Sequence, residues 1–100
     1  MIAELLWEKQ AQSDRENIFR YLYQEAGLLV ASATDDKFVS LAEMLRINPE
    51  AGVIAGRSCK QRKLTVDRFP FIIIYIIEKN QAHILLVLHT SRRISGKYIR

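Results

Sequence analysis

Cysteine is nearly absent from this sequence of 100 residues, in which Cys59 stands alone. A single cysteine excludes an internal disulfide and a metal site built from several thiolates, and it agrees with a reducing compartment. Histidine is also scarce. Because His83 and His89 are the only two and no carboxylate cluster stands near them, we expect no metal site. No glycine-rich phosphate loop and no GxSxG turn is present, and we expect no cofactor.

An apolar run of membrane-spanning length is missing as well. The run at 69–77 has about half of the ~20 residues that a bilayer helix needs, and no charged-then-apolar signal sequence opens the chain. We therefore expect a cytoplasmic protein without a membrane partner. The chain has 49% hydrophobic and 26% charged residues, which is typical of globular proteins, and its length predicts one domain, 1–100, around one modest core.

Positive charge is concentrated in the second half of the chain. Residues 1–50 hold five Lys/Arg against nine Asp/Glu, whereas residues 51–100 hold ten against two, which gives −4 and +8. Such an uneven distribution indicates a polyanion or an acidic protein surface as partner, unless the cations only face solvent.

The first half of the chain predicts a short strand and two helices. Residues 2–7 alternate loosely, as a strand does. Ser13 and Glu16 have the spacing of a capping box, apolar positions recur at helical intervals up to Ala26, and Gly27 is a plausible stop, so we expect a helix over about 9–26. A second apolar stripe predicts a helix over about 29–47, which Asn48-Pro49 ends. The two helices should form an antiparallel hairpin.

The second half predicts strands. The small, glycine-bearing stretch 50–58 is typical of a loop, and strands are expected at 61–66, 69–77 and 82–89, with turns at Asp67 and at 78–81. The last two strands are too apolar to be half-exposed, so both of their faces should be covered, at least one of them by helices. The whole is an α+β domain in which the N-terminal strand and the helical hairpin pack on a mostly antiparallel four-stranded sheet.

The candidate catalytic side chains lie in the basic half of the chain. Its Arg, Lys, His and Tyr residues could hold a phosphodiester and transfer protons to and from it. His89, at the end of the last predicted strand, is either a structural histidine or a proton donor or recognition contact. Tyr98 is either an anchor for the C-terminus or an acid. Tyr75, in the middle of an apolar strand, should lie in the core with its hydroxyl bonded at an edge.

The order and spacing of these residues resemble the RelE/ParE toxin superfamily of bacterial type II toxin–antitoxin modules. The resemblance covers nearly the whole chain. It is carried by Arg62-x-Leu64-x-Val66-x-Arg68-Phe69-Pro70-Phe71, then Tyr75, a polar turn, and Val87-Leu88-His89-x-x-Arg92, after a strand, a helical hairpin and Asn48-Pro49-Glu50-Ala51-Gly52.

The superfamily has two functions, and the resemblance leaves both open for this chain. RelE-like members are ribosome-dependent endoribonucleases that cut messenger RNA, whereas ParE-like members lack most of the catalytic residues and poison DNA gyrase. For a nuclease, the matching candidates would be Lys60, Arg62, Arg68, His89 and Tyr98, but no glutamate stands at a convincing general-base position, because Glu78 belongs to a hairpin turn.

The ending His89-Thr90-Ser91-Arg92-Arg93 and the sequence Arg68-Phe69-Pro70-Phe71 are most similar to the ParE branch. This resemblance implies a toxin without chemistry of its own that inhibits gyrase, blocks replication and arrests growth, as in plasmid maintenance. The surface that contacts the target would then comprise Arg62, Arg68, His89, Arg92 and Arg93. It also implies an antitoxin with an acidic segment that occupies an apolar groove with a basic rim, and a dimer or a toxin–antitoxin hetero-oligomer as the assembly.

Overall fold

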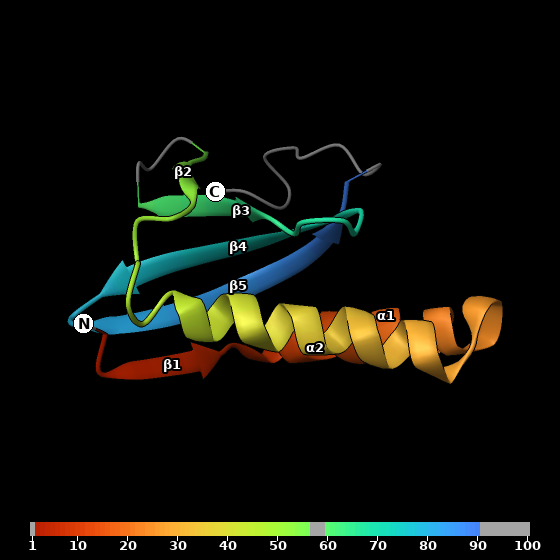
Figure 1. Ribbon diagram of the computed structural model, residues 1–100. Coiled ribbons are helices and arrows are strands. Elements are labelled where there is room, and N and C mark those ends of the chain that lie inside the picture. The colour runs from red at the N-terminus through yellow and green to blue at the C-terminus, as the bar shows by residue number, and fades with distance from the viewer. Residues whose placement is uncertain (1, 57–59, 91–100) are drawn as a thin grey trace.

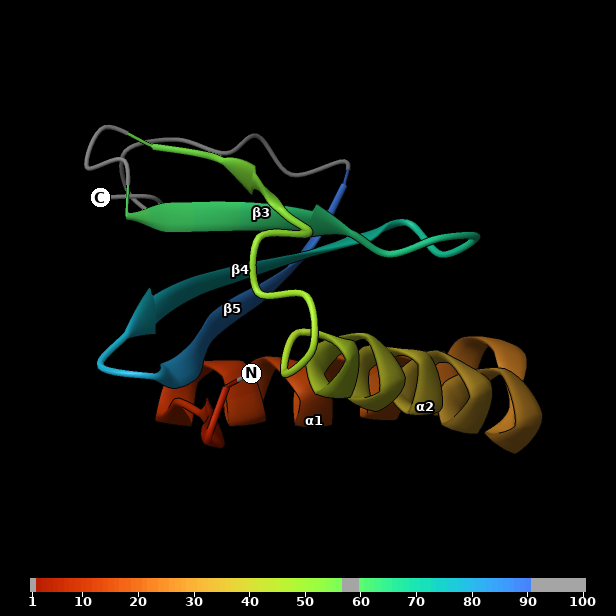
Figure 2. The same ribbon diagram turned by 60° about the vertical axis from the view of Figure 1, so that its left-hand side comes forward.

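The fold is a helical hairpin packed on one face of a five-stranded sheet (Figures 1 and 2). The computed structural model describes residues 2–56 and 60–90. In chain order the elements are β1 (Glu4–Trp7), α1 (Lys9–Ala26), α2 (Leu28–Met44), β2 (Val53–Ile54), β3 (Gln61–Thr65), β4 (Phe71–Glu78) and β5 (Gln81–His89). Arg92, Arg93 and Tyr98 lie outside the described residues, as does Cys59.

The sheet has the strand order β1-β5-β4-β3-β2, with β1 parallel to β5 and every other pair antiparallel. The predicted α+β class and mostly antiparallel sheet are confirmed, but the predicted count of four strands is wrong. The fifth strand, β2, lies within the stretch 50–58 that the glycines indicated to be a loop. It pairs with β3 through only Val53 and Ile54, which is too short a stretch to show a strand pattern in the sequence.

The helices begin and end almost where the apolar periodicity places them. The capping prediction at Ser13 is wrong, because α1 already begins at Lys9 and Ser13 lies inside it. Gly27 separates the two helices at a φ of 93°, a backbone conformation that glycine adopts without strain. A single residue between antiparallel helices makes the hairpin tight, and both views show its closed end projecting past the sheet (Figures 1 and 2).

The two turns that flank β4 differ in length from the predicted ones: the first is longer and the second is shorter. Between β3 and β4 the chain turns at 67–70, so β4 begins at Phe71 rather than at Phe69. Between β4 and β5 only Lys79 and Asn80 form the turn, both at positive φ, and Glu78 pairs with Gln81. Two positive-φ residues match the right-handed twist of a two-residue hairpin.

The core is centred on β4, whose residues 71–75 are all buried. Toward the helices, alternate residues Phe71, Ile73 and Tyr75 join a cluster that also contains Phe38 of α2 and Ile84 and Val87 of β5. On the opposite face a second cluster forms around Ile72, Ile74 and Leu88. The expectation that both faces of this strand are covered is therefore confirmed, with helices on one face only.

A β-bulge at Leu85 changes which side of β5 faces the helices. Tyr75 pairs with Ile84 and Ile74 pairs with Leu86, so Leu85 has no partner on β4. Strand residues normally alternate between faces, and one extra residue reverses the alternation beyond it. The helix-facing cluster accordingly contains Ile84 and then Val87, three positions later. His89, two residues after Val87, faces the same side of the sheet and contacts Phe71.

Asp14 of α1 binds the sheet beside this bulge. One carboxylate oxygen, Oδ2, accepts a hydrogen bond from the backbone N–H of Val87 at 2.9 Å. A buried backbone N–H without a partner is costly, and the disrupted ladder at a bulge is where such a group arises. The contact therefore stabilises the bulged form of β5 and fixes α1 against the sheet.

We predict that Asp14→Ala lowers the free energy of unfolding by about 1–3 kcal/mol, because it leaves the Val87 N–H without its acceptor. Urea denaturation measures the loss, and hydrogen exchange at the Val87 amide should accelerate. Asp36→Ala, which removes an exposed carboxylate from α2, serves as the matched control. An equal loss in both variants would contradict the role given to Asp14.

Candidate functional site

The sequence-derived site residues that the structure describes lie at two ends of the sheet. Arg62 pairs with Tyr75, whereas His89 pairs with Phe71. These partners are four residues apart on β4, which corresponds to about 13 Å along a strand. Arg68 lies in the turn before β4, three residues ahead of Phe71. The structure thus brings Lys60 together with Arg62, but it does not bring these two and His89 into one cleft.

At one end, Lys60 and Arg62 line a cavity of about 320 Å³ that we call the charged pocket. Its lining residues are Pro49, Glu50, Lys60, Arg62, Ile77 and Glu78. Glu78, which the sequence assigns to a turn, is the last residue of β4 and shares this pocket with the two cations. The place of Glu50 and Glu78 beside Lys60 could not be read from the sequence, because it depends on the register of β4 and on the contact of Pro49 with Tyr75. With two carboxylates beside two cations, the pocket is less suited to an anion than the sequence suggests.

Arg62 is held at this end by a network of hydrogen bonds. Its Nη1 donates to the backbone O of Gly52 at 2.7 Å. The Gly52 N–H donates to the hydroxyl of Tyr75 at 2.9 Å, and that hydroxyl donates to the backbone O of Pro49 at 2.8 Å. The prediction of a core tyrosine with its hydroxyl bonded at an edge is confirmed. The stretch 49–52 after α2 is therefore bound to the middle of the sheet.

Only glycine fits position 52 in this arrangement. A Cβ there would stand 2.8 Å from Cε1 of Tyr75 and 2.9 Å from both its hydroxyl and the backbone O of Lys63. Two of these neighbours belong to a side chain that is wholly buried, and the third is backbone, so none can move without disturbing the core. The glycine at position 52 thus serves close packing.

Burial raises the pKa of the Tyr75 hydroxyl above 10.0, against the smaller lowering effects of the Gly52 N–H and the positive charge of Arg62. The unfolded chain therefore binds fewer protons than the folded chain once the pH exceeds about 10, since only its tyrosine ionises there. The stabilising contribution of Tyr75 is complete below pH 10 and declines as the pH rises further.

We predict that Tyr75→Phe costs about 1–3 kcal/mol of unfolding free energy at neutral pH, because the Gly52 N–H and the Pro49 carbonyl lose their partner. The difference from wild type should shrink at about pH 11, where the wild-type contribution declines. Urea denaturation at both pH values measures this change. Tyr21→Phe, at a tyrosine that is 63% exposed, is the control and should show neither effect. A cost that does not depend on pH would contradict the assignment.

At the other end of the sheet lies an apolar cavity of about 580 Å³, here called the apolar groove. It is lined by Asn17, Ile18, Tyr21, Leu22, Val30, Thr34, Phe69, Pro70, Phe71 and His89. Both helices, the β3–β4 turn and the end of β5 contribute to it. The expected apolar groove between helices and sheet is confirmed. Tyr21 is 63% exposed and Val30 is 41% exposed, so the groove opens to solvent at the helical hairpin.

Two of the residues that line this groove, Phe71 and His89, belong to a series of rings in edge-to-face contact. Phe38 of α2 contacts Phe71 edge-to-face at 5.3 Å, and Phe71 contacts the ring of His89 in the same geometry at 5.3 Å. Such pairs stabilise by about 0.5–1.5 kcal/mol beyond the area that they bury. His89 is thus held by packing while its side chain remains exposed.

Arg68 lies in the turn beside the groove. Its side chain is 88% exposed, at a backbone φ of 69°, and its Nε lies 3.9 Å from the carboxylate of Asp67. An exposed pair at that separation contributes little to stability. The cation is therefore presented to solvent next to Phe69, where it adds positive charge beside the apolar groove.

Within residues 2–56 and 60–90, no group of His, Cys, Asp and Glu could hold a metal ion. Over the same residues, no helix is long and apolar enough to cross a membrane.

Comparisons with known proteins agree with the fold. The family model described as the ParE toxin of the type II toxin–antitoxin system, parDE, matches residues 5–94. A search of curated proteins gives no match. Among solved structures, a chain of the chromosomal ParDE toxin–antitoxin system from P. aeruginosa superposes with a TM-score of 0.80 at 22% sequence identity, covering 90% of this chain and 98% of that one. At that identity the likeness shows the shared fold.

Proposed function

Because the chain belongs to the family of ParE toxins of type II toxin–antitoxin systems, we propose that it arrests growth by inhibiting DNA gyrase. The observation that carries the proposal is the match of the ParE toxin model over residues 5–94, which runs from Leu5 in β1 past the end of β5 and includes the arginine pair at 92–93. The resemblance to the ParE branch, noted from the residues around Arg68 and His89, points in the same direction.

The geometry supports inhibition by binding rather than cleavage of RNA. General acid–base catalysis requires the participating groups to converge on one reacting atom at hydrogen-bonding distance. Among the described candidates, Lys60 and Arg62 belong to the charged pocket, and His89 belongs to the apolar groove about 13 Å away along β4. Cations spread over the basic half of the chain suit a contact surface instead. On this proposal Arg62, Arg68, His89, Arg92 and Arg93 contact the target.

A supercoiling assay tests the function directly. Purified toxin titrated into gyrase and relaxed plasmid should abolish supercoiling and produce linear, cleaved DNA, because a poison stalls the enzyme after it has cut. Arg92→Ala/Arg93→Ala should prevent both effects, and growth arrest, while the fold remains intact. Lys9→Ala/Lys37→Ala removes the same charge from the helical hairpin and should leave inhibition unchanged.

Two outcomes would overturn this proposal. Folded wild-type toxin in large molar excess without any effect on gyrase would exclude the target. Persistent growth arrest by the Arg92→Ala/Arg93→Ala variant, at an equal level of protein, would exclude the assigned surface.

The partner that controls the toxin is, on this proposal, an antitoxin whose acidic segment occupies the apolar groove. The groove is lined mainly by apolar side chains, His89 lines its sheet end, and Arg68 precedes the lining residue Phe69 in the adjoining turn. An amphipathic helix or an extended segment binds such a groove by burying its apolar side chains, and acidic residues beside them would meet the cations. A short gene immediately upstream, encoding a protein with an acidic C-terminal half, would be expected.

We predict that Val30→Asp weakens binding of this antitoxin at least about tenfold, because it places a charge in an apolar contact. Val39→Asp is the matched control: Val39 is 38% exposed on the same helix, against 41% for Val30, and does not line the groove. Isothermal titration calorimetry with the upstream gene product measures both affinities. Equal weakening by the two variants would place the antitoxin elsewhere.

A further inference from the structure

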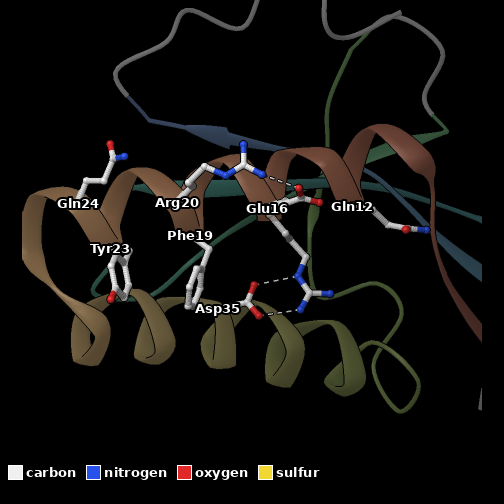
Figure 3. Close-up of a pocket in the computed structure, with 8 residues that line it drawn as sticks. Gln12, Glu16, Phe19, Arg20, Tyr23, Gln24 and Asp35 are labelled. Atoms are coloured by element: carbon white, nitrogen blue, oxygen red, sulfur yellow. Dashed lines mark hydrogen bonds and ion pairs between the residues drawn. The ribbon is translucent and has the colours of Figure 1, made fainter.

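A second groove lies between the two helices, and it shares no lining residue with the apolar groove. This hairpin groove has a volume of about 590 Å³ and is lined by Gln12, Arg15, Glu16, Phe19, Arg20, Tyr23, Gln24 and Asp35. Figure 3 shows Phe19 and Tyr23 projecting from α1 toward α2, with Asp35 facing them from α2. Tyr23 is 55% exposed, so its ring is accessible to a partner at this groove.

The wall of the hairpin groove is held rigidly. Arg15 binds Asp35 through two parallel hydrogen bonds, Nε to Oδ1 at 2.9 Å and Nη2 to Oδ2 at 2.8 Å. The same guanidinium lies 4.4 Å from the ring centroid of Trp7 in β1. Bidentate and stacked arginines have few alternative positions, so β1, α1 and α2 are joined at one point. A ligand would thus meet a preformed surface.

Four exposed polar residues follow one another along α1 at intervals of four. They form a ridge in the order Gln12, Glu16, Arg20, Gln24 (Figure 3). Read in the opposite direction, the ridge is complementary to itself. Gln12 opposes Gln24 of a second copy, and Glu16 opposes Arg20. An interface with twofold symmetry requires this property. If residue i of one copy contacts residue j of the other, then residue j of the first copy also contacts residue i of the second.

We propose that the hairpin groove is the interface of a homodimer in which the α1 ridges of two copies pack antiparallel. Packing of i±4 ridges from both helices is the commonest class of helix contact in globular proteins. Each copy forms two charge pairs with the other, between Glu16 and Arg20, and Tyr23 with Phe19 supplies the apolar area beside them. This inference does not depend on gyrase or on the antitoxin.

The contact within one chain does not oppose this dimer. Glu16 and Arg20 already form an ion pair at 2.6 Å, but their side chains are 70% and 63% exposed. An exposed pair of this kind contributes little, so its exchange for a pair between copies costs little. Because the two grooves have separate linings, the dimer leaves the apolar groove open to a further partner.

Charge reversal tests the proposal with its own internal control. In wild type, sedimentation equilibrium over a concentration series should give a mass that rises from 11.6 kDa toward twice that value. Glu16→Arg and Arg20→Glu each place like charges opposite one another, and each should weaken self-association at least about tenfold. The double variant, Glu16→Arg/Arg20→Glu, restores opposite charges and should associate again. A mixture of the two single variants should form a heterodimer.

Tyr23→Lys tests the apolar part of the interface against Tyr21→Lys, a matched substitution on the same helix that falls in the apolar groove. Only Tyr23→Lys should weaken the dimer. Wild type that stays at 11.6 kDa at the highest concentration overturns the proposal. It is equally overturned if the double variant or the mixture stays monomeric, or if the groove instead binds the antitoxin. Circular dichroism of each variant confirms that helix content is retained.

Discussion

The hydrogen bond between the Asp14 carboxylate and the Val87 N–H joins the helical hairpin to the sheet. It lies beside the bulge at Leu85, which reverses the alternation of β5 and turns Val87 and His89 toward the helices. Without the extra residue, His89 would face away from Phe71, and the apolar groove would lose its sheet end. One carboxylate on α1 therefore connects the position of the helical hairpin to the composition of the groove beneath it.

At the other end of the sheet, the Tyr75 hydroxyl holds the segment that follows α2. It forms hydrogen bonds with both Pro49 and Gly52, so the segment after α2 crosses the sheet at a fixed place. The carbonyl of Gly52 in turn accepts a hydrogen bond from Arg62. Arg62 is therefore partly occupied in holding the fold. On the proposed function Arg62 would also contact the target, so its loss would affect stability as well as binding.

The apolar groove, the cations of the basic half and the hairpin groove are suited to different partners. The apolar groove matches a segment that buries hydrophobic side chains, the cations of the basic half suit the target, and the hairpin groove is complementary to itself. The two grooves share no lining residue. On the two proposals together, an antitoxin would occupy the apolar groove while the α1 ridges of two copies pair at the hairpin groove.

Much of the architecture follows from the sequence alone. Apolar periodicity determined the two helices to within three residues, the apolar runs determined a buried β4, and the residues from Arg62 to Arg92 indicated the superfamily. These features depend on local patterns or on motif order, which one chain displays in full. The separation of Lys60 and Arg62 from His89 could not be predicted, because the register of strands is set by packing between distant residues. Neither could β2, the bulge at Leu85 or the place of Glu78 in the charged pocket. Each of these arises when an unpaired backbone group or an apolar face finds a partner far away in the chain, which only the tertiary structure decides.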